Sequence, residues 1–454
     1  VKTRAFRLAD KRVCIGGAPV QESYLNIEKN IQGALAAGAD AIHPGFGFLS
    51  ENSDFALACE KAGIIFIGPT SDQIKNLGDK IVCKEVVKSL GLPLVPGYEG
   101  DNQAVDFLVT EAIKIGFPVI VKAAAGGGGR GMKVLNNKDE AKELIESAQR
   151  EALSAFGSSK VFLEKYLNRA KHIEFQIFAD ATGQVRHLFD RECSVQRRHQ
   201  KIIEEAPSPS LSEALREKMG EAAVAIVSKI GYRGAGTVEF LLQDEHFYFL
   251  EVNTRLQVEH SVTEMILGVD LVKMQIKTAM KEPVFLSNEK YKIKGSSIEC
   301  RLYAENPFMG GIPSTGKLGH VLFQEGYGRR FEYGFEEGDV VTSNYDSMIA
   351  KIIVWDETRN RTIDKMLRVL SESVIFGVYT NIPLLEKIID HKEFREATMT
   401  TRFFETYFSE PLKKVELTSD ESEFVKMGLK SLAPNSSLKK TEIESPWAQY
   451  WRNI

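Results

Sequence analysis

Short apolar runs alternate with helical patterns along the first hundred residues. Residues 12–16 and 41–43 have the apolar pattern of short strands, and residues 27–37 between them have helical spacing and end at Gly38. Residues 63–68 form another apolar run, bounded by glycines. Strands that alternate with helices pair in parallel through crossover connections. The pattern therefore predicts a doubly wound α/β unit at the N-terminus.

Two further units follow a boundary at residues 91–97, a stretch with two prolines and two glycines. The second unit combines a strand at 117–122, a glycine-rich loop at 123–131, a returning strand at 132–135 and a helix capped by Asn137. In the third unit, a helix over 215–230 precedes an antiparallel hairpin with strands at 237–242 and 246–253. We expect domains at 1–85, 86–167 and 168–412, followed by a tail at 413–454.

Composition is that of a soluble globular protein. Of 454 residues, 43% are hydrophobic and 26% charged, which excludes disordered and fibrous chains. No apolar run approaches the roughly 20 residues of a membrane helix, and a net charge of −4 gives no overall field for nucleic acid. Five separated cysteines without a C-x-x-C pair indicate a reducing compartment. We expect a cytoplasmic protein, or one of the mitochondrial matrix if a transit peptide before Val1 was removed.

The glycine-rich loop suits phosphate binding. Five of the six residues at 126–131 are glycine, and the loop joins two predicted strands, so it is neither a P-loop nor a Rossmann fingerprint. Without Cβ atoms, its backbone N–H groups can close over phosphates. Lys122 ends the preceding strand and Lys80 follows Gly78 and Asp79, so two ammonium groups could hold a triphosphate under this lid. A flexible turn and two solvated lysines remain the alternative.

The segment 250–260 carries the most informative pattern. Five polar residues alternate with apolar ones and would share one side of an extended chain: Glu251, Asn253, Arg255, Gln257 and Glu259. A three-residue hairpin loop at 244–246 would place Glu239 opposite Glu251, with Cβ atoms about 5 Å apart. Two carboxylates and an amide oxygen form a hard-oxygen site for Mg²⁺. The alternative is the exposed face of an edge strand.

Other polar groups suggest anion chemistry. Arg255 could fork onto an oxyanion, and Glu259 is near enough in sequence to act as a base. Residues 190–201 are densely basic and polar, as in a solvated loop or a nucleic-acid patch, although the net acidity argues against the second. His199 and Lys201 could instead bind phosphate or a small anion. His172 precedes an apolar strand and fits a structural role as well as a ligand-binding one.

Together these stretches resemble the biotin carboxylase family of ATP-grasp enzymes. The resemblance runs in order from about residue 8 to 408 and is most specific at 193–201 and 251–265. Other matching segments lie at 41–52, 78–80, 126–132, 162–167, 191–207, 231–236 and 345–348. It implies an α/β fold, α+β in part: an ATP-grasp fold with an N-terminal doubly wound (pre-ATP-grasp, Rossmann-like) domain, a glycine-lid domain and a C-terminal biotin carboxylase domain.

The resemblance implies the biotin carboxylase component of an acyl-CoA carboxylase of the acetyl-CoA or propionyl-CoA type. Such ligases use ATP, Mg²⁺ or Mn²⁺, and bicarbonate to form carboxyphosphate, and then carboxylate biotin on a carrier protein. Matches to the family's nucleotide-binding positions are Lys80, Lys122, Gly128, Gly129, Glu164, Lys165, Tyr166, Leu167, His172, Gln196 and His199. Glu239, Glu251 and Asn253 match the metal ligands, which the hairpin argument also predicts.

The remaining matches concern bicarbonate and biotin. Arg255, Gln257 and the Val258 backbone match the bicarbonate site, with Glu259 as the base. By the same resemblance, Lys201 would steady bicarbonate and carboxyphosphate. Arg330 would stabilise the biotin enolate, with the adjacent Arg329 as the alternative.

The sequence also departs from the family pattern. A strand and helix bearing Asn-Arg-Gly-Glu do not precede Leu8, which leaves the family's homodimer contacts open. Ala replaces one glycine of the lid found in some relatives, and Ser261 stands where Pro is common. The tail has no Ala-Met-Lys-Met biotin-attachment site, so we expect the carrier, like the carboxyltransferase component, on another chain or a missing part. Another ATP-grasp carboxylate ligase and an inactive regulatory subunit are the rival interpretations.

Overall fold

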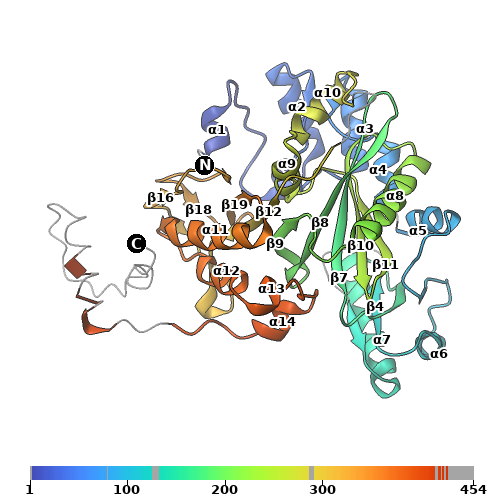
Figure 1. Cartoon of the computed structure of the whole chain (residues 1–454). Helices are drawn as coiled ribbons and strands as arrows, with labels where there is room; N and C mark the ends of the chain where they lie inside the picture. The colour runs from blue at the N-terminus through green and yellow to red at the C-terminus, as the bar shows by residue number, and fades with distance from the viewer. Residues whose placement is uncertain are drawn as a thin grey trace.

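A computed structural model describes residues 3–78, 80–124, 132–285 and 291–414, and several positions between 418 and 427. Figure 1 places the N-terminal helices at the top, the glycine-lid unit at the lower right and the C-terminal helices at the left. A long sheet runs between them and connects the parts of the molecule.

The N-terminal unit is a small parallel sheet packed against helices. Strand β1 (Ala41–Ile42) pairs in parallel with β2 (Ile65–Phe66), which confirms the predicted crossover. The flanking elements are α1 (Arg4–Leu8), η1 (Val20–Glu22), α2 (Ile27–Ala37), α3 (Ser53–Lys61), α4 (Ser71–Gly78) and α5 (Lys80–Ser89). Helix α2 ends at Gly38 in the left-handed conformation, φ 68°, as predicted.

The strand predicted at residues 12–16 is wrong. This segment belongs to no ladder in the part of the chain that the structure describes. The Arg12 guanidinium donates instead to the carbonyl oxygen of Arg7 at 3.0 Å, within the preceding helix. An apolar run forms a strand only where a neighbouring strand offers partners for its N–H and C=O groups.

The glycine-lid unit is a four-stranded antiparallel sheet of order β3-β6-β4-β5. Its strands are β3 (Gly97–Tyr98), β4 (Val119–Ala123), β5 (Lys133–Leu135) and β6 (Val161–Lys165). Helices α6 (Val105–Ile115) and α7 (Lys138–Phe156) pack on the sheet and bury its apolar residues. The predicted cap is confirmed, because the Asn137 side chain accepts from the Asp139 and Glu140 amides.

An eight-stranded sheet of order β11-β10-β7-β8-β9-β12-β19-β17 forms the centre of the molecule. Its strands are β7 (Lys171–Ala179), β8 (Val185–Arg197), β9 (Gln200–Ala206), β10 (Gly234–Gln243), β11 (His246–Asn253), β12 (Ser296–Tyr303), β17 (Arg329–Tyr333) and β19 (Met348–Asp356). Helix α8 (Glu213–Lys229) covers the β7 face that carries Ile173 and Phe175. The alternate residues His172 and Glu174 therefore face the other side, on which α9 (His260–Leu267) and α10 (Leu271–Ala279) pack.

The C-terminal part covers the far end of this sheet. Helices α11 (Arg359–Glu372), α12 (Ile382–Ile389), α13 (Lys392–Arg395) and α14 (Phe403–Tyr407) lie there. Short ladders join β13 (Glu305–Asn306) to β14 (Ile312–Pro313), β15 (Gly316–Lys317) to β18 (Val340–Val341), and β16 (His320–Leu322) to β20 (Val374–Phe376), with η2 (Pro307–Met309) between. The apolar residues of β12, β19 and α11 form one continuous core.

The basic run at 190–201 is a hairpin with a buried base and an exposed turn. Strands β8 and β9 form most of it, joined by a two-residue turn at Arg198 and His199, whose φ values are 52° and 64°. Arg191 is fully buried, at 0% exposure. The solvated-loop interpretation is therefore wrong for the strands, where Glu174 holds Arg191 and Lys201, and fits only the turn, where Arg198 and His199 are exposed.

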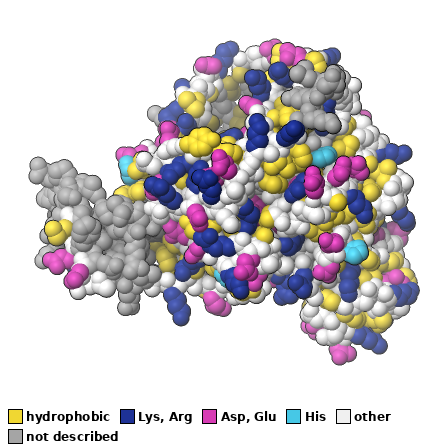
Figure 2. Space-filling view, in the orientation of Figure 1, with side chains coloured by type: hydrophobic (Ala, Val, Ile, Leu, Met, Phe, Trp, Pro, Cys, Tyr) yellow, Lys and Arg dark blue, Asp and Glu magenta, His cyan; other side chains and the backbone are white. Residues whose placement is uncertain are grey.

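Figure 2 shows Lys and Arg intermixed with Asp and Glu over the visible face. Among the described residues, the helices are too short or too polar to cross a bilayer.

Candidate active site

The hairpin of β10 and β11 places Glu239 opposite Glu251, as predicted. The route to this pairing differs from the prediction. The turn holds two residues, Asp244 and Glu245, both with positive φ (51° and 62°), as in a type I′ hairpin. A β-bulge then leaves Leu250 without a partner. The bulge supplies the one-residue shift that the expected three-residue loop would have given.

The extended segment is shorter than predicted. Strand β11 ends at Asn253, and residues 254–259 form an irregular link to α9 rather than one strand up to Glu259. Arg255 is held in this link by Glu51, whose Oε2 accepts from Nε at 2.9 Å. The Arg255 guanidinium also donates to Gln257 Oε1 at 2.7 Å and Asn253 Oδ1 at 3.2 Å. The polar side chains thus still converge, although by irregular backbone.

A cavity of about 870 Å³ lies between the glycine-lid unit and the central sheet. Most of the predicted site residues line it: Lys122, Glu164, Lys165, Tyr166, Leu167, His172, Gln196, His199, Lys201, Glu239, Glu251, Asn253, Arg255, Gln257 and Val258. These positions come from two units, the glycine-lid unit and the unit that contains the central sheet. The cavity is large enough for a nucleotide with a second small substrate.

At the lid end of the cavity, Glu164 lies between two ammonium groups. Lys84 Nζ lies 2.7 Å from Glu164 Oε1, and Lys122 contacts the other oxygen. Burial alone would raise the pKa of Glu164, but Lys122 and Lys84 offset it and lower that pKa to about 2. The carboxylate therefore holds the two ammonium groups at the edge of the space predicted for phosphates.

Residues 165–167, at the end of β6 and called the hinge below, have a fixed backbone. The Tyr166 amide donates to the Pro118 carbonyl at 3.0 Å. The Lys165 ammonium donates to the carbonyl oxygens of Gly116 and Phe117 at 2.8 and 2.9 Å. These bonds tie the hinge to the start of β4.

Lys201 contacts three carboxylates. Its Nζ lies 2.5 Å from Glu174 Oε2, 2.7 Å from Glu259 Oε1 and 2.9 Å from Glu239 Oε1. Burial disfavours the charge, but the three carboxylates more than offset it and keep the pKa of Lys201 well above its ordinary value. Lys201 is therefore an ammonium, fixed at the floor of the cavity.

Glu259 is a fully buried carboxylate between two cations. Its second oxygen, Oε2, accepts from Arg301 Nη2 at 2.9 Å. Burial would raise the pKa of Glu259, but Lys201, Arg301 and Arg191 hold it well below its ordinary value. The group is ionised at neutral pH and has lone pairs fixed in position, as a proton acceptor requires.

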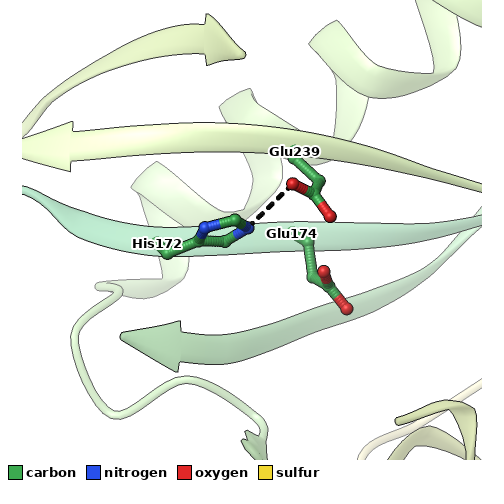
Figure 3. Close-up of side chains that lie close together, drawn as sticks. All are labelled: His172, Glu174 and Glu239. Atoms are coloured by element: carbon green, nitrogen blue, oxygen red, sulfur yellow. Dashed lines mark ion pairs between the residues drawn. The ribbon is translucent and has the colours of Figure 1, made fainter. Parts of the chain in front are cut away.

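Two sets of side chains that include Glu239 could hold a metal ion. In Figure 3, the His172 ring points toward Glu239, and His172 Nε2 lies 3.0 Å from Glu239 Oε2. His172 Nδ1 is in turn 3.0 Å from Gln196 Nε2. His172, Glu174 and Glu239 lie close enough to share an ion, but Arg191 and Lys201 already occupy the Glu174 oxygens at 2.5 Å each.

The predicted ligands suit a hard cation better. Glu239 and Glu251 face each other across the hairpin, and Asn253 lies one alternate position further along β11, where its Nδ2 donates to Glu239 Oε1 at 2.9 Å. All three line the cavity. Carboxylate and amide oxygens on adjacent strands are the ligands that Mg²⁺ takes when it also binds phosphates. The donor set therefore fits Mg²⁺ or Mn²⁺.

The structure separates the two adjacent arginines. Arg329 turns toward α11 and donates to Glu372 Oε2 at 2.6 Å. Arg330 turns toward α9, where it donates to Glu264 Oε2 at 2.7 Å and contacts Glu332. Neither lines the cavity in this structure. Arg330 reaches it only indirectly, because Glu332 Oε2 is 2.9 Å from Lys351 Nζ, which donates to the carbonyl of the lining residue Val258.

Three predicted residues lie outside the described part of the chain. Gly128 and Gly129 belong to the segment 125–131, and the side chain of Lys80 is likewise not described. Their predicted contacts with phosphate stay predictions.

Family models match the chain in three consecutive parts. Residues 1–74 match the N-terminal domain of biotin carboxylase, and residues 299–406 match its C-terminal domain. Residues 79–286 match the ATP-binding domain of the carbamoyl-phosphate synthase L chain. The chain belongs to the biotin carboxylase family. It is an ATP-dependent ligase with the ATP-grasp fold, as the sequence resemblance implied.

Two relatives have similar sequences over nearly the whole chain. Biotin carboxylase 1 of Bacillus subtilis is 45% identical over 403 residues, 88% of this chain and 90% of its own length. The mitochondrial methylcrotonoyl-CoA carboxylase subunit alpha of Dictyostelium discoideum is 47% identical over 446 residues, 97% of this chain. The chain spans only 64% of that relative and 55–60% of three plant relatives with the same name.

A solved structure of a biotin carboxylase domain has a similar fold. The biotin carboxylase domain dimer of Hydrogenobacter thermophilus 2-oxoglutarate carboxylase, in complex with MgADP, ADP and bicarbonate, has a TM-score of 0.84. It is 45% identical, and the match covers 89% of each chain.

Sequence reasoning missed several polar partners of the site. Lys84 shares Glu164 with Lys122, Glu51 holds Arg255, and Arg301 holds Glu259. Glu51 lies inside the 41–52 segment that carries the resemblance, so the segment could have directed attention to it. No sequence signal distinguishes Lys84 or Arg301 from an ordinary surface cation.

Proposed function

We propose that this chain performs the first half-reaction of an acyl-CoA carboxylase, the MgATP-dependent carboxylation of biotin by bicarbonate. The observation that supports it most directly is the buried Glu259 carboxylate, held between Lys201 and Arg301 beside the cavity. An ionised, oriented base beside a cavity that Arg255 lines is what deprotonation of a bound oxyanion such as bicarbonate requires.

Bicarbonate would bind against Arg255, Gln257 and the Val258 backbone. Glu259 would take its proton, and Lys201 would stabilise the negative charge that develops on the oxygen attacking the γ-phosphorus of ATP. The bond from that phosphorus to the bridging oxygen breaks, so ADP leaves and carboxyphosphate forms. Preorganised cations in a partly enclosed site provide this kind of stabilisation most effectively.

The nucleotide would extend from the hinge to the floor of the cavity. Lys165, Tyr166 and Leu167 would border the adenine, while Lys122 and Lys80 would hold phosphates under Gly128 and Gly129. His172, Gln196 and His199 would contact the nucleotide from β7, β8 and the turn that follows. Glu239, Glu251 and Asn253 would hold Mg²⁺ or Mn²⁺, which when bound neutralises charge on the phosphate oxygens.

Biotin would be carboxylated at N1′, whose proton is weakly acidic. The bond from the carboxyl carbon of carboxyphosphate to the bridging oxygen would break to give CO₂ and inorganic phosphate, and the phosphate would take the N1′ proton. The enolate left on the ureido oxygen is stabilised by a nearby cation, and its N1′ bonds to CO₂. We assign this role to Arg330. It contacts Glu332, which in turn contacts Lys351. Arg330 would have to turn from Glu264 toward the cavity.

The partners follow from the reaction and from the relatives. Biotin would arrive on a carrier protein or domain, and a carboxyltransferase component would use the product. A homodimer is part of this proposal, since the Hydrogenobacter domain was solved as a dimer. The acceptor of the whole enzyme would be an acyl-CoA, and the compartment would be the cytoplasm or the mitochondrial matrix.

The test is ATP hydrolysis by the 454-residue chain with Mg²⁺ and free biotin, with and without bicarbonate in CO₂-depleted buffer. Turnover that requires bicarbonate and rises with biotin is the expected result. Bicarbonate-independent turnover would favour another ATP-grasp ligase. Bound ATP without turnover would favour an inactive subunit.

A further inference from the structure

Two buried glutamates without an assigned role lie behind Glu259. Glu204 on β9 and Glu299 on β12 are direct partners in the antiparallel ladder, so their Cβ atoms are about 5 Å apart. Both side chains are fully buried, at 0% exposure. Among the described atoms, Glu204 Oε2 and both carboxyl oxygens of Glu299 lack a hydrogen-bond partner. Such orphaned oxygens are costly for carboxylates.

The cations near this pair already have carboxylate partners. Arg301 binds Glu204 Oε1 at 2.6 Å but also binds Glu259 Oε2. Lys351 is 3.5 Å from Glu299 Oε2 but 2.9 Å from Glu332 Oε2. Two additional negative charges would thus be buried without full compensation, an arrangement that proteins avoid by protonation.

We propose that Glu204 and Glu299 share one proton, as a carboxylic acid hydrogen-bonded to a carboxylate, and that this pair positions Arg301 against the base Glu259. The proton would lie between Glu204 Oε2 and a Glu299 oxygen, two of the orphaned atoms. Glu204 would then keep its negative charge, and Arg301 would be its only cationic partner. This inference rests on the proposed function, because Glu259 matters as the base of that reaction.

The charges around the pair determine whether loss of its proton raises or lowers activity. The titratable groups that interact with the pair, from β8, β9, β12, β17, β19 and the link before α9, are Cys193, Lys201, Glu259, Cys300, Arg301, Tyr303, Glu332 and Lys351. Burial raises the pKa of both thiols and raises that of Tyr303 to about 12, so these three groups are neutral near pH 7. Burial also raises the pKa of Glu299, to about 8, against the attraction of Lys351.

Loss of the shared proton would disturb the bicarbonate site. A second full charge beside Arg301 would draw the guanidinium away from Glu259, and it would repel the anionic substrate. We therefore expect kcat/KM for bicarbonate to fall about tenfold per pH unit above the apparent pKa of the pair. Affinity for nucleotide, whose adenine is assigned to residues 165–167, should change less.

The test compares Glu299→Gln with the unchanged chain. The amide is permanently neutral and can donate to Glu204 Oε2, so the variant should keep its turnover at neutral pH and move the alkaline fall to higher pH. Glu205→Gln is the matched control. Its carboxylate is equally buried but turns to the opposite face and forks onto Arg359 at 2.6 and 3.1 Å. An alkaline fall unchanged in Glu299→Gln, or moved equally in Glu205→Gln, would overturn the proposal.

An infrared measurement on the unchanged chain needs neither turnover nor a variant. The difference between spectra at pH 6 and pH 9 should contain the C=O stretching band of a buried carboxylic acid, and Glu299→Gln should lose it. Absence of the band at pH 6 would refute the shared proton even if the chain is an active biotin carboxylase. Presence of the band without bicarbonate-dependent turnover would refute the proposed function instead.

Discussion

Glu51 and Arg255 are 204 residues apart in the sequence, yet Glu51 Oε2 accepts a hydrogen bond from Arg255 Nε at 2.9 Å. The other oxygen, Oε1, accepts from the Thr254 amide at 2.9 Å. The carboxylate therefore fixes both the backbone and the side chain of the link after β11. The N-terminal unit contributes in this way to a site whose other groups lie in the central sheet and the glycine-lid unit.

Glu51→Gln should weaken bicarbonate binding. The amide can satisfy only one of the two donors, so Arg255 loses an anchor. The Glu51 side chain is 39% exposed, and a bridge of that exposure contributes about 1 kcal/mol or less. We expect KM for bicarbonate to rise about three- to fivefold, with KM for ATP unchanged. Glu28→Gln, on exposed α2, is the control, and an equal change there would exclude a specific role for Glu51.

Glu259→Gln should abolish bicarbonate-dependent ATP hydrolysis while leaving nucleotide binding intact. Removal of a general base costs roughly 10²- to 10⁴-fold in rate. Gln keeps the volume between Lys201 and Arg301, whereas Ala would leave two buried cations facing a void. Binding of a fluorescent ATP analogue measures the nucleotide, and a variant with normal turnover would remove the assigned role.

Glu251→Gln should weaken the Mg²⁺ dependence of nucleotide binding, because a neutral amide is a poorer ligand for a hard cation. The measurement is a titration of nucleotide affinity against Mg²⁺ concentration. Glu245→Gln, in the turn of the same hairpin, should behave as the unchanged chain. If Glu251→Gln kept the same Mg²⁺ dependence, the hairpin would not be the metal site.

Acid should destabilise the chain partly through Glu164. Its folded pKa of about 2 lies below the value of about 4.3 in an unfolded chain. The unfolded state therefore binds more protons between these values, so this contribution is complete above about pH 4.3 and is lost as pH falls toward 2. It amounts to about 3 kcal/mol. Urea unfolding at pH 3 and 6 should show a smaller difference for Glu164→Gln than for the unchanged chain; an equal difference would contradict this account.

Local patterns were sufficient for most of the elements. The cap at Asn137 and the helix end at Gly38 depend on nearby residues alone, and the structure has both. The parallel pairing of β1 with β2 followed from the alternation of strands and helices. The predicted pairing of Glu239 with Glu251 was correct, although the predicted loop was one residue too long. The β-bulge supplies the residue that the shorter turn lacks.

The buried charges could not be predicted from composition. Charged residues are usually exposed, so the run at 190–201 read as a loop, whereas Arg191 is buried against Glu174 and Thr263 from distant elements. Arg301 and Glu299 look like ordinary strand residues in the sequence. Their roles depend on β12 lying beside β9, a long-range pairing that no local pattern specifies.

The compensation between turn and bulge also limits how this hairpin can evolve. An insertion in the turn alone, or loss of the unpaired Leu250 alone, would rotate the Glu251 carboxylate to the opposite face of the sheet. Only a matched pair of length changes would keep it facing Glu239. Among functional descendants of this sequence, the separation of the two glutamates along the chain should be invariant, while turn length and bulge vary together.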